Sequence, residues 1–392
     1  MKQKKIAIFL FDIQDVSGGG GVERFWADVF RMYPKNSKDY KLYFFMDNDT
    51  YHALTKIKRL VSNDNIVFII NSRSSNSVLK NFSDSVNFIF KLLTYKIDIL
   101  HCAFYGPHYY KRLKYLGLLP KFIRPKIVLT EVTSMTPYCY IDEKVEELFK
   151  LRKYFLDDFY NNIKIDGIFT WYQLTKKVLE ENNIVKSKPI IYAVKHCFTD
   201  LSNFKPLQKE NNVVFASRLV PLKHPEWFLQ AVINLYKSKK ELLKGWKFYL
   251  YGKGPMEKEL HQEVINHNLQ EILFISSSPT MNEILGKSKL FVSCQDYENF
   301  TSLVMLEAMA CGNVIVSRNV GQTNYFAREG VNGFLAAEDN IQGLTKALEK
   351  ALMNREEHDV MATESIKIAN DEHNIYNFMQ ELKEYWNAIL KN

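Results

Sequence analysis

The sequence predicts an α/β protein made of two doubly wound, Rossmann-like domains, in which helices cover both faces of a parallel sheet. Short segments rich in β-branched and aromatic residues alternate with helical patterns along the chain, and such alternation is typical of parallel sheets. Some segments, such as Ile6–Phe11, are apolar throughout, as strands buried on both faces are. The length of 392 residues suggests two domains.

The predicted strands form two groups with a break between them. In the first group they cover Lys5–Phe11, Lys41–Met46, Ile66–Ile70, Ile97–His101, Lys126–Glu131, Gly167–Thr170 and Pro189–Ala193. In the second group they cover Asn212–Ser217, Lys247–Tyr251, Ile272–Ile275, Leu290–Ser293 and Asn313–Ser317. Residues 200–212 are polar and lack periodicity, which predicts a linker. We therefore expect domains at residues 1–200 and 201–373, with ligands bound beyond the carboxyl ends of the strands.

The composition is typical of a soluble globular protein, with 46% hydrophobic and 24% charged residues. No apolar run approaches the roughly 20 residues that cross a bilayer, and Ile6–Phe11 is shorter than the core of a secretion signal. The five cysteines are scattered and include no CxxC pair, which argues against disulfides or a zinc site. We therefore expect a cytoplasmic protein in a reducing compartment.

The net charge of +8 is concentrated in residues 1–200, whereas the remainder of the chain is close to neutral. This asymmetry suggests an anionic partner for the first domain, with nucleic acid, acidic lipid and phosphorylated substrates as the possible classes. The sequence contains no recognised module for reading nucleic acid, so we expect no nucleic-acid partner.

A run of glycines, Gly18–Gly21, follows the first predicted strand and opens a helix. Glycines let a backbone approach a ligand closely, and a helix N-terminus attracts anions. The run is not a dinucleotide fingerprint, because Glu23 fills the third glycine position, and it lacks the Lys-Ser/Thr pair of a P-loop. Either Gly20 and Gly21 contact a ligand or the loop is simply flexible.

Two cations, Arg218 and Lys223, lie in the loop after the first strand of the second domain. The planar guanidinium fork and the ammonium point charge together suit a diphosphate. The alternative is that both side chains are solvated loop cations.

Residues 303–311 are predicted to form a helix, with Thr301 or Ser302 as its cap and Gly312 as its end. Glu307 is its only charged residue, and an otherwise apolar helix is expected to be buried. A buried carboxylate needs partners, which could be ligand hydroxyls or a cation of the protein itself.

These segments resemble the family 4 retaining glycosyltransferases, which belong to glycosyl transferases group 1 and have the GT-B fold. The matching pieces are GGGGVERF, FASRLVPLKHPEWFLQAV, YGKGPMEKEL, SKLFVSCQDYENFTSLVMLEAMACG and NVIVSRNVGQTNYFAREGVNGFLAA. The resemblance implies a nucleotide diphosphate sugar as the donor substrate, with neither cofactor nor metal. It also implies that the C-terminal helix, residues 374–392, crosses back to the first domain.

The resemblance also assigns roles to individual residues. Arg218 and Lys223 would grip the donor diphosphate, Glu307 would hold the ribose, and Glu298 would contact the transferred sugar as a catalytic residue. The phosphates would meet the amides of Phe300, Thr301, Ser302 and Leu303 and, from the first domain, the loop of Gly20 and Gly21.

Two departures from the family pattern affect these roles. Eight residues instead of the usual seven separate Glu298 from Glu307, so Asn299 is an alternative for the sugar contact. The family often has a histidine after the strand matching Ile127–Thr130, where this chain has none, and His101 is the nearest catalytic substitute in the first domain.

The expected function is that of a metal-independent retaining glycosyltransferase that acts in surface polysaccharide synthesis. A UDP-sugar is the favoured donor, with a GDP-sugar possible, and the acceptor would be a glycan or a lipid-linked molecule. The alternatives are an epimerase or phosphorylase of the same fold, or a relative that binds nucleotide sugars without catalysis.

Residues 109–126 combine six basic residues with interleaved aromatic and leucine side chains, and they contain no acidic residue. Such a mixture suits the surface of an anionic membrane, which predicts peripheral docking on the inner face through Lys111, Arg112 and Lys114. The alternative is a solvated helix whose leucines pack inward.

Overall fold

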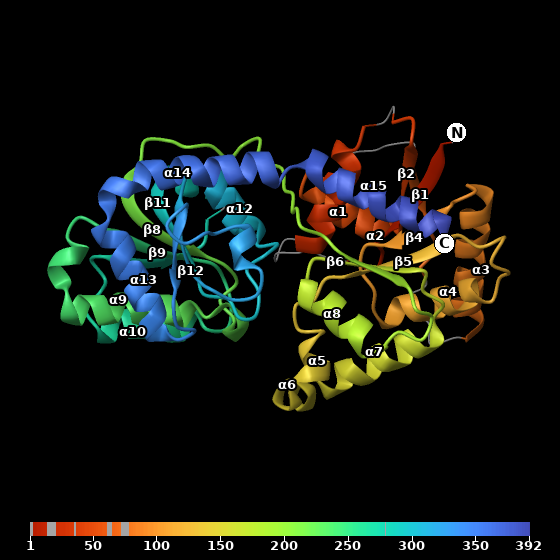
Figure 1. The fold of residues 1–392 in the computed structure, drawn as a ribbon, viewed down its shortest axis with the longest axis horizontal. Helices are drawn as coiled ribbons and strands as arrows, with labels where there is room; N and C mark the ends of the chain where they lie inside the picture. Colours follow the sequence, from red (N-terminus) through yellow and green to blue (C-terminus); the bar gives the residue numbers. More distant parts are fainter. Residues whose placement is uncertain (1–2, 14–20, 35–36, 61–64, 72–77, 279) are drawn as a thin grey trace. The chain divides into compact units, whose positions relative to one another are not determined.

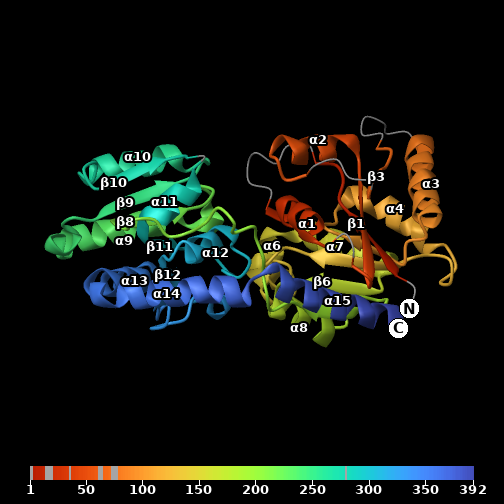
Figure 2. The same ribbon diagram turned by 90° about the horizontal axis from the view of Figure 1, so that it is seen from above.

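The structure, a computed structural model, describes residues 3–13, 21–34, 37–60, 65–71, 78–278 and 280–392. The chain divides into two compact units, which are drawn in Figures 1 and 2. Unit 1 contains Met1–Val194 and Phe378–Asn392, and unit 2 contains Lys195–Asn377. The first boundary thus lies a few residues before the predicted one, and most of the C-terminal helix belongs to unit 1.

Unit 1 contains a seven-stranded parallel sheet with the order β3-β2-β1-β4-β5-β6-β7. Its strands are β1 (Lys4–Phe9), β2 (Tyr40–Met46), β3 (Ile66–Phe68), β4 (Ile99–Cys102), β5 (Lys126–Glu131), β6 (Gly167–Thr170) and β7 (Ile190–Ala193). Every strand predicted for this half of the chain is present. The order reverses direction between β1 and β4, as it does in doubly wound sheets.

Helices cover both faces of this sheet. They are α1 (Gly21–Met32), α2 (Asn48–Lys56), α3 (Val78–Thr94), α4 (Pro107–Gly117), α5 (Tyr138–Ile141), α6 (Glu143–Leu148), α7 (Lys150–Asn162), α8 (Gln173–Glu181) and α15 (Ile375–Lys391). On one face, Phe88 of α3 and Tyr109 of α4 pack against Phe9 of β1. On the other face, Trp26 of α1 and Trp386 of α15 pack against His101 of β4.

Unit 2 contains a six-stranded parallel sheet with the order β10-β9-β8-β11-β12-β13. Its strands are β8 (Glu210–Ala216), β9 (Lys247–Tyr251), β10 (Leu273–Ser276), β11 (Ser288–Ser293), β12 (Val314–Arg318) and β13 (Gly333–Ala336). Strand β13 was not predicted from the sequence, and it begins with Gly333. That glycine lies so close to β12 that a Cβ would sit 2.3 Å from the Ile315 carbonyl oxygen.

The helices of unit 2 also lie on two faces. They are α9 (Pro225–Ser238), α10 (Glu257–Asn266), α11 (Met281–Lys287), α12 (Leu303–Ala310), α13 (Ile341–Met353) and α14 (His358–Lys367). One core cluster joins the strands to Phe228 of α9 and to Leu344 and Leu348 of α13. The predicted linker, residues 200–212, is attached to unit 2 near its end, because the Leu207 N–H donates to the Gly286 carbonyl of α11 at 3.0 Å.

Within the described residues, no helix combines the length and the apolar character that a transmembrane segment needs.

Candidate functional site

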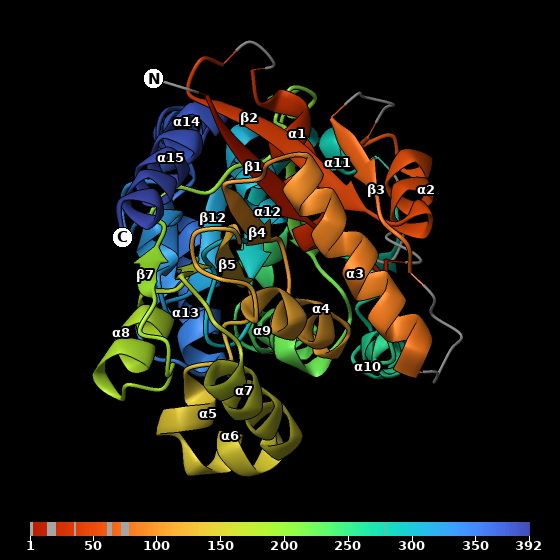
Figure 3. The same cartoon turned by 90° about the vertical axis from the view of Figure 1, so that its right-hand side faces the viewer.

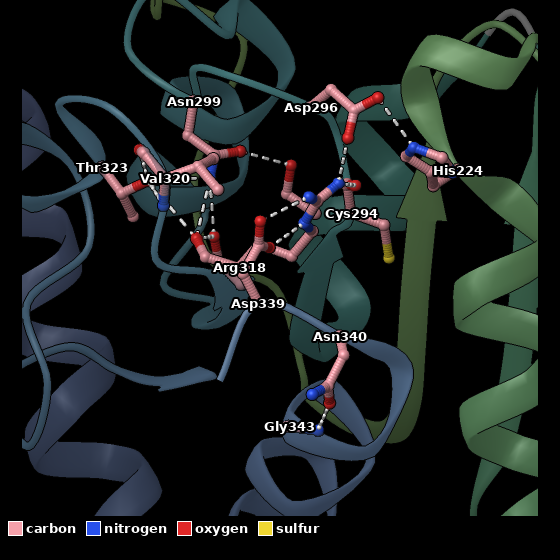
Figure 4. Close-up of polar contacts among 12 residues, drawn as sticks. His224, Cys294, Asp296, Asn299, Arg318, Val320, Thr323, Asp339, Asn340 and Gly343 are labelled. Carbon is pink, nitrogen blue, oxygen red and sulfur yellow. Dashed lines mark hydrogen bonds and ion pairs between the residues drawn. The ribbon is translucent and has the colours of Figure 1, made fainter. Parts of the chain in front are cut away.

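Two loops of unit 2 gather most of the predicted site residues at one edge of its sheet, and a third loop packs against them. The three loops follow β8, β11 and β12, which are neighbours in the sheet and run parallel. The carboxyl ends of these strands therefore meet at one edge, where ligands of doubly wound sheets bind. Hydrogen bonds between the loops, drawn in part in Figure 4, fix their relative positions.

The loop after β8 carries both predicted cations. Arg218 is exposed, whereas Lys223 ends a short 3-10 turn (η1, Pro221–Lys223) and is partly buried. The Lys223 ammonium donates to Oε1 of Gln295 in the loop after β11. Burial, and secondarily the charge of Arg218, lowers the pKa of Lys223 to about 8. The lysine is thus held in place by a neutral amide instead of being neutralised by a carboxylate.

Two glycines of the turn after β9 hold this loop by close backbone approach. A Cβ on Gly252 would lie 1.9 Å from the Ser217 carbonyl oxygen, and a Cβ on Gly254 would lie 2.2 Å from that of Leu219. The Leu219 N–H donates to the Lys253 carbonyl at 2.9 Å. The GKG sequence therefore has a packing role beside Arg218.

Glu298 lies in the loop after β11 and is largely buried. Its carboxylate accepts hydrogen bonds from the backbone N–H of Phe300 at 2.8 Å and of Gln322, in the loop after β12, at 2.8 and 3.0 Å. Burial raises the pKa of Glu298 to about 7, against the lowering effect of these N–H groups. Gly321 makes the approach possible, because its φ is +52° and a Cβ there would lie 2.4 Å from Glu298 Oε2.

Asn299, the alternative for the sugar contact, is fully buried. Its Oδ1 accepts from the Ser293 hydroxyl at 2.7 Å, and its Nδ2 donates to acceptors that include Ser317 Oγ at 2.9 Å and Thr323 Oγ1 at 2.8 Å. The side chain therefore joins the ends of β11 and β12 and has no surface to offer a ligand. This geometry corrects the sugar-contact hypothesis for Asn299 and leaves Glu298 as the candidate.

Helix α12 begins and ends as predicted but is less buried than expected. Ser302 occupies the cap position without a hydrogen bond from its side chain to the helix, and Gly312 follows the helix with a φ of +70°. Leu303, Val304 and Glu307 are only half-buried and share one face. The prediction of a buried carboxylate was wrong, because this face of the helix reaches the surface. Glu307 nevertheless has an interaction partner in the structure.

The amides predicted to meet phosphates differ in their availability. The Phe300 N–H is already bonded to Glu298, and the Ser302 N–H donates to the Asn299 carbonyl at 3.0 Å. The Phe300 ring is buried against Tyr325. Thr301 and Leu303 are half-buried, and Thr301 has a φ of +69°. A role of the Phe300 and Ser302 amides in phosphate binding would therefore require them to exchange partners.

Arg318, the last residue of β12, is buried and was not among the residues predicted for the site. Its guanidinium donates to Asp339 at 2.6 and 2.9 Å and to Asp296 at 2.5 Å. It also lies 4.2 Å from the centre of the Trp227 ring of α9. Figure 4 shows Arg318 between Asp339 and Asp296. Arg318 thereby fixes the loop that carries Gln295 and Glu298.

His224 extends this network to the cation loop. Its Nε2 lies 2.8 Å from Asp296 Oδ2, and its Nδ1 lies 2.5 Å from Glu226 Oε1. His224 adopts a left-handed conformation with φ +46° and immediately follows Lys223. The Asp296 N–H donates to the Leu222 carbonyl at 3.1 Å. The chain from Arg318 through Asp296 to His224 therefore determines where Lys223 lies.

The structure places the other predicted catalytic residue, His101, inside the core of unit 1. It is fully buried and contacts the rings of Trp26, Phe169 and Trp386. The Trp386 indole N–H donates to its Nδ1 at 3.1 Å, so Nε2 carries the proton and donates to Thr130 Oγ1 at 3.0 Å. Burial lowers the pKa of His101 to about 3. A catalytic role is therefore wrong for this neutral, enclosed side chain.

Two further predictions for unit 1 have different outcomes. Gly20 lies outside the described residues, and Gly21 begins α1 at an exposed position, where an added Cβ would meet no atom within 4 Å. In the segment 109–126, Arg112 is buried, with its guanidinium 4.4 Å from the centre of the Phe11 ring and 3.7 Å from Asp84. The membrane role of Arg112 was therefore wrong, whereas Lys111 and Lys114 are exposed.

Comparison with known proteins finds a family match within unit 2. Residues 199–368 match the family described as glycosyl transferases group 1. The chain is 24% identical over 207 residues to the GtfA subunit of a UDP-N-acetylglucosamine–peptide N-acetylglucosaminyltransferase from Streptococcus pneumoniae, covering 51% of this chain and 40% of that protein. It is 27% identical over 154 residues to a D-inositol 3-phosphate glycosyltransferase from Gordonia bronchialis, covering 37% and 33%. The matched regions thus span less than half of these relatives.

Solved structures resemble the chain over nearly its whole length. Anabaena HepE in complex with UDP and glucose has a TM-score of 0.69 at 14% identity, covering 98% of this chain and 99% of that one. A glycosyltransferase from Rickettsia africae has a TM-score of 0.70 at 14% identity, with both chains fully covered. Pneumococcal GtfA in complex with UDP and GlcNAc has a TM-score of 0.63 at 12% identity, again over both whole chains. These similarities confirm the predicted GT-B fold class.

Proposed function

We propose that the chain is a retaining glycosyltransferase with a nucleotide diphosphate sugar as donor, since residues 199–368 match the family described as glycosyl transferases group 1. The observation that carries the proposal is the convergence of Arg218, Lys223 and Glu298 at the carboxyl edge of the unit 2 sheet. A UDP-sugar is the favoured donor, because HepE and GtfA, which share the fold, bind UDP.

Each group at this edge has a role in the proposal. Arg218 and Lys223 bind the diphosphate and stabilise the charge that develops on it during transfer. The half-buried N-terminus of α12 adds the positive end of its dipole to the same site. Glu307 accepts hydrogen bonds from ribose hydroxyls. Glu298 contacts the transferred sugar and, with its raised pKa, can donate or accept a proton there near neutral pH.

The proposed transfer requires no nucleophile from the protein. The bond between C1 of the sugar and the diphosphate oxygen breaks, and a bond from the acceptor hydroxyl oxygen to C1 forms on the same face of the ring. The acceptor proton passes to the leaving diphosphate. The two cations neutralise that diphosphate, so we propose that no metal ion is needed. The protein contributes positioning and electrostatic stabilisation.

We also propose a cytoplasmic role in surface polysaccharide synthesis, with a glycan or lipid-linked acceptor bound mainly by unit 1. The basic character of residues 1–200 supports an anionic acceptor, and a sugar linked to a lipid through phosphate groups has that charge.

A thermal-shift screen of nucleotide diphosphates and their sugars tests the donor assignment. A ligand present at 100 times its dissociation constant stabilises the protein by about 2.7 kcal/mol. We expect UDP and one UDP-sugar to raise the melting temperature in buffer containing EDTA. No shift with any nucleotide diphosphate, or a shift only after adding manganese, would contradict the proposed site.

The product distinguishes the alternatives of the same fold. Slow release of UDP and free sugar without acceptor supports a transferase and contradicts a non-catalytic binding protein. An epimerase instead returns an isomeric nucleotide sugar, and a phosphorylase releases a sugar phosphate only when inorganic phosphate is present. Chromatography of one reaction mixture separates these products.

A further inference from the structure

The outer face of α3 carries an exposed apolar stripe. It lies outside residues 109–126, for which membrane docking was predicted. Its members are spaced three or four residues apart, as on one side of a helix, and they are Leu79, Phe82, Val86, Phe90 and Leu93. Their exposed fractions are 80%, 51%, 49%, 66% and 37%. At 1.5 Å per residue, the stripe is about 21 Å long.

The opposite face of the same helix already forms the core of unit 1. Phe88 and Leu92 are fully buried, and Phe88 stacks on Phe9 of the sheet. The helix is therefore apolar on both sides, with one side committed to its own sheet and the other open. Single exposed apolar residues are ordinary, but a continuous row of them marks a binding surface.

Helix α4 extends this surface beside α3. Figure 3 shows the two helices next to each other on the outside of unit 1. The Phe82 and Tyr115 rings meet edge to face, with their centres 5.6 Å apart. One turn before Tyr115 lies the exposed Lys111, and beyond it lie Leu118 and Phe122, which are 73% and 88% exposed.

Within residues 79–124, the exposed charged side chains are of one sign. From Leu79 to Arg124, a segment that the structure describes throughout, the only acidic residues are Asp84 and Asp98. Asp84 is buried beside Arg112, and Asp98 pairs with Lys4. The exposed charges of this segment are therefore lysines, namely Lys80, Lys96, Lys111, Lys114 and Lys121.

We propose that the α3 stripe is a membrane-docking surface for anionic lipid. An interfacial helix immerses its apolar side chains at the boundary between headgroups and acyl chains, while flanking lysines reach the lipid phosphates. The surface goes beyond the proposed sugar transfer and does not depend on it, because it lies on other residues and its binding needs no nucleotide sugar. It also relocates the docking surface from residues 109–126 to α3, with the exposed part of α4 as its basic flank.

Vesicle co-sedimentation of the whole protein tests the apolar part of the proposal. We expect binding to phosphatidylglycerol-containing vesicles and on the order of tenfold weaker binding after L79S/F90S, which remove two exposed apolar side chains. The matched control is V360S/Y376S, which removes side chains that are 68% and 80% exposed in unit 2. Equal binding of the two variants at unchanged melting temperature would overturn the proposal.

Charge substitutions test the basic flank. K80Q/K111Q/K114Q should lose binding at least as strongly as the apolar variant, whereas K244Q/K258Q/K346Q in unit 2 lowers the net charge equally and should bind like wild type. Parallel losses in both triple variants would show that net charge alone drives binding and would overturn the α3 assignment. Binding that is equal for neutral and anionic vesicles would also overturn it.

A fluorescent label reports insertion directly. The five native cysteines are free and buried, so a new surface cysteine can be labelled selectively. Val86 and Ile265 are 49% and 53% exposed, which makes V86C and I265C a matched pair. A polarity-sensitive dye should shift to the blue with anionic vesicles in V86C only. Sedimentation velocity completes the test: a dimer that L79S/F90S dissociates, without vesicle binding, would assign the stripe to a protein contact instead.

Discussion

The polar residues predicted at the carboxyl edges of the two sheets have different surroundings in the structure. In unit 2, loops after three neighbouring strands bring Lys223, Gln295 and Glu298 together through the hydrogen bonds and ion pairs of a common network. In unit 1, the single predicted residue His101 is sealed in the core by Trp386, a residue 285 positions away. Several residues in a fixed order predicted which side chains lie at one sheet edge, whereas one polar residue at a strand end does not reveal whether a helix covers it.

The largest expected effect tests whether Arg318 organises the unit 2 edge. Arg318→Met keeps the length of the side chain but leaves Asp296 and Asp339 without their cation. Removing one partner of a buried ion pair costs about 3–5 kcal/mol, and the half-exposed Asp339 places the expected loss of unfolding free energy near the lower end. Urea unfolding of the whole protein measures this loss of unfolding free energy.

The matched control for this substitution is Arg328→Met. Arg328 also makes a close pair with a carboxylate, Glu372, but both side chains are more than a third exposed. Exposed pairs contribute about 0–1 kcal/mol. Equal losses in the two variants would mean that the Arg318 network has no special role.

A smaller effect is expected in unit 1 and tests whether His101 is structural. His101→Leu leaves the Trp386 N–H and the Thr130 hydroxyl without their present partner, and an orphaned buried donor costs about 1–3 kcal/mol. We expect a melting temperature several degrees lower, with UDP affinity and turnover preserved below the unfolding transition. A folded variant with wild-type stability and no turnover would restore the catalytic hypothesis.

The lowered pKa of the same histidine predicts that stability depends on pH. The pKa of His101 is about 3 in the folded state and lies near 6.5 in the unfolded state. The unfolded chain therefore binds the proton more readily, and stability is lost as pH falls below 6.5. His101→Leu should therefore lose less stability than wild type between pH 7 and pH 5, while the contributions of His358 and His373, whose pKa values burial also lowers, remain in both proteins.

Donor binding should respond to the cations of unit 2. Arg218→Ala or Lys223→Ala removes one charge-assisted contact to a diphosphate, which is worth about 2 kcal/mol. Isothermal titration with UDP should therefore show roughly 30-fold weaker binding. Lys244→Ala, which removes a lysine that is 76% exposed elsewhere in unit 2, is the control. Wild-type affinity in both cation variants would place the diphosphate elsewhere.

The fold is predictable from the sequence where local patterns determine the outcome. All the predicted strands are present, because fully apolar segments between helices leave few alternatives to a buried parallel strand. Strand β13 was not predicted, although β6, which is also a four-residue strand that begins with glycine, was. Without β13, the sequence did not indicate that Asp339, in the loop directly after this strand, would pair with Arg318.

For the candidate site, the sequence indicated which segments meet at the edge of the unit 2 sheet but not the burial and bonding of each side chain. Glu298 and Asn299 are adjacent, yet one faces two backbone amides and the other is enclosed by hydroxyl groups. Glu307 was expected inside an apolar helix, but α12 has one open face. Burial of a given residue depends on neighbouring strands and helices, which its own segment does not specify.

The smallest expected effect concerns the pH dependence of donor binding and follows from how Lys223 is held. Its partner is the neutral amide of Gln295, and burial lowers its pKa to about 8 in the free protein. A bound diphosphate favours the protonated ammonium, so binding draws a proton onto Lys223 at higher pH. The affinity for UDP should therefore be nearly constant from pH 7 to 7.5 and fall above pH 8, by at most tenfold per pH unit.

Lys223→Arg keeps a permanent charge and should bind UDP with little change up to pH 9. Titrations at pH 8.5 in buffers of different ionisation enthalpy should show proton uptake by wild type and not by this variant. Equal pH profiles for the two proteins would show that Lys223 does not bind the diphosphate as the free ammonium, and would remove one of the two cations from the proposed donor site.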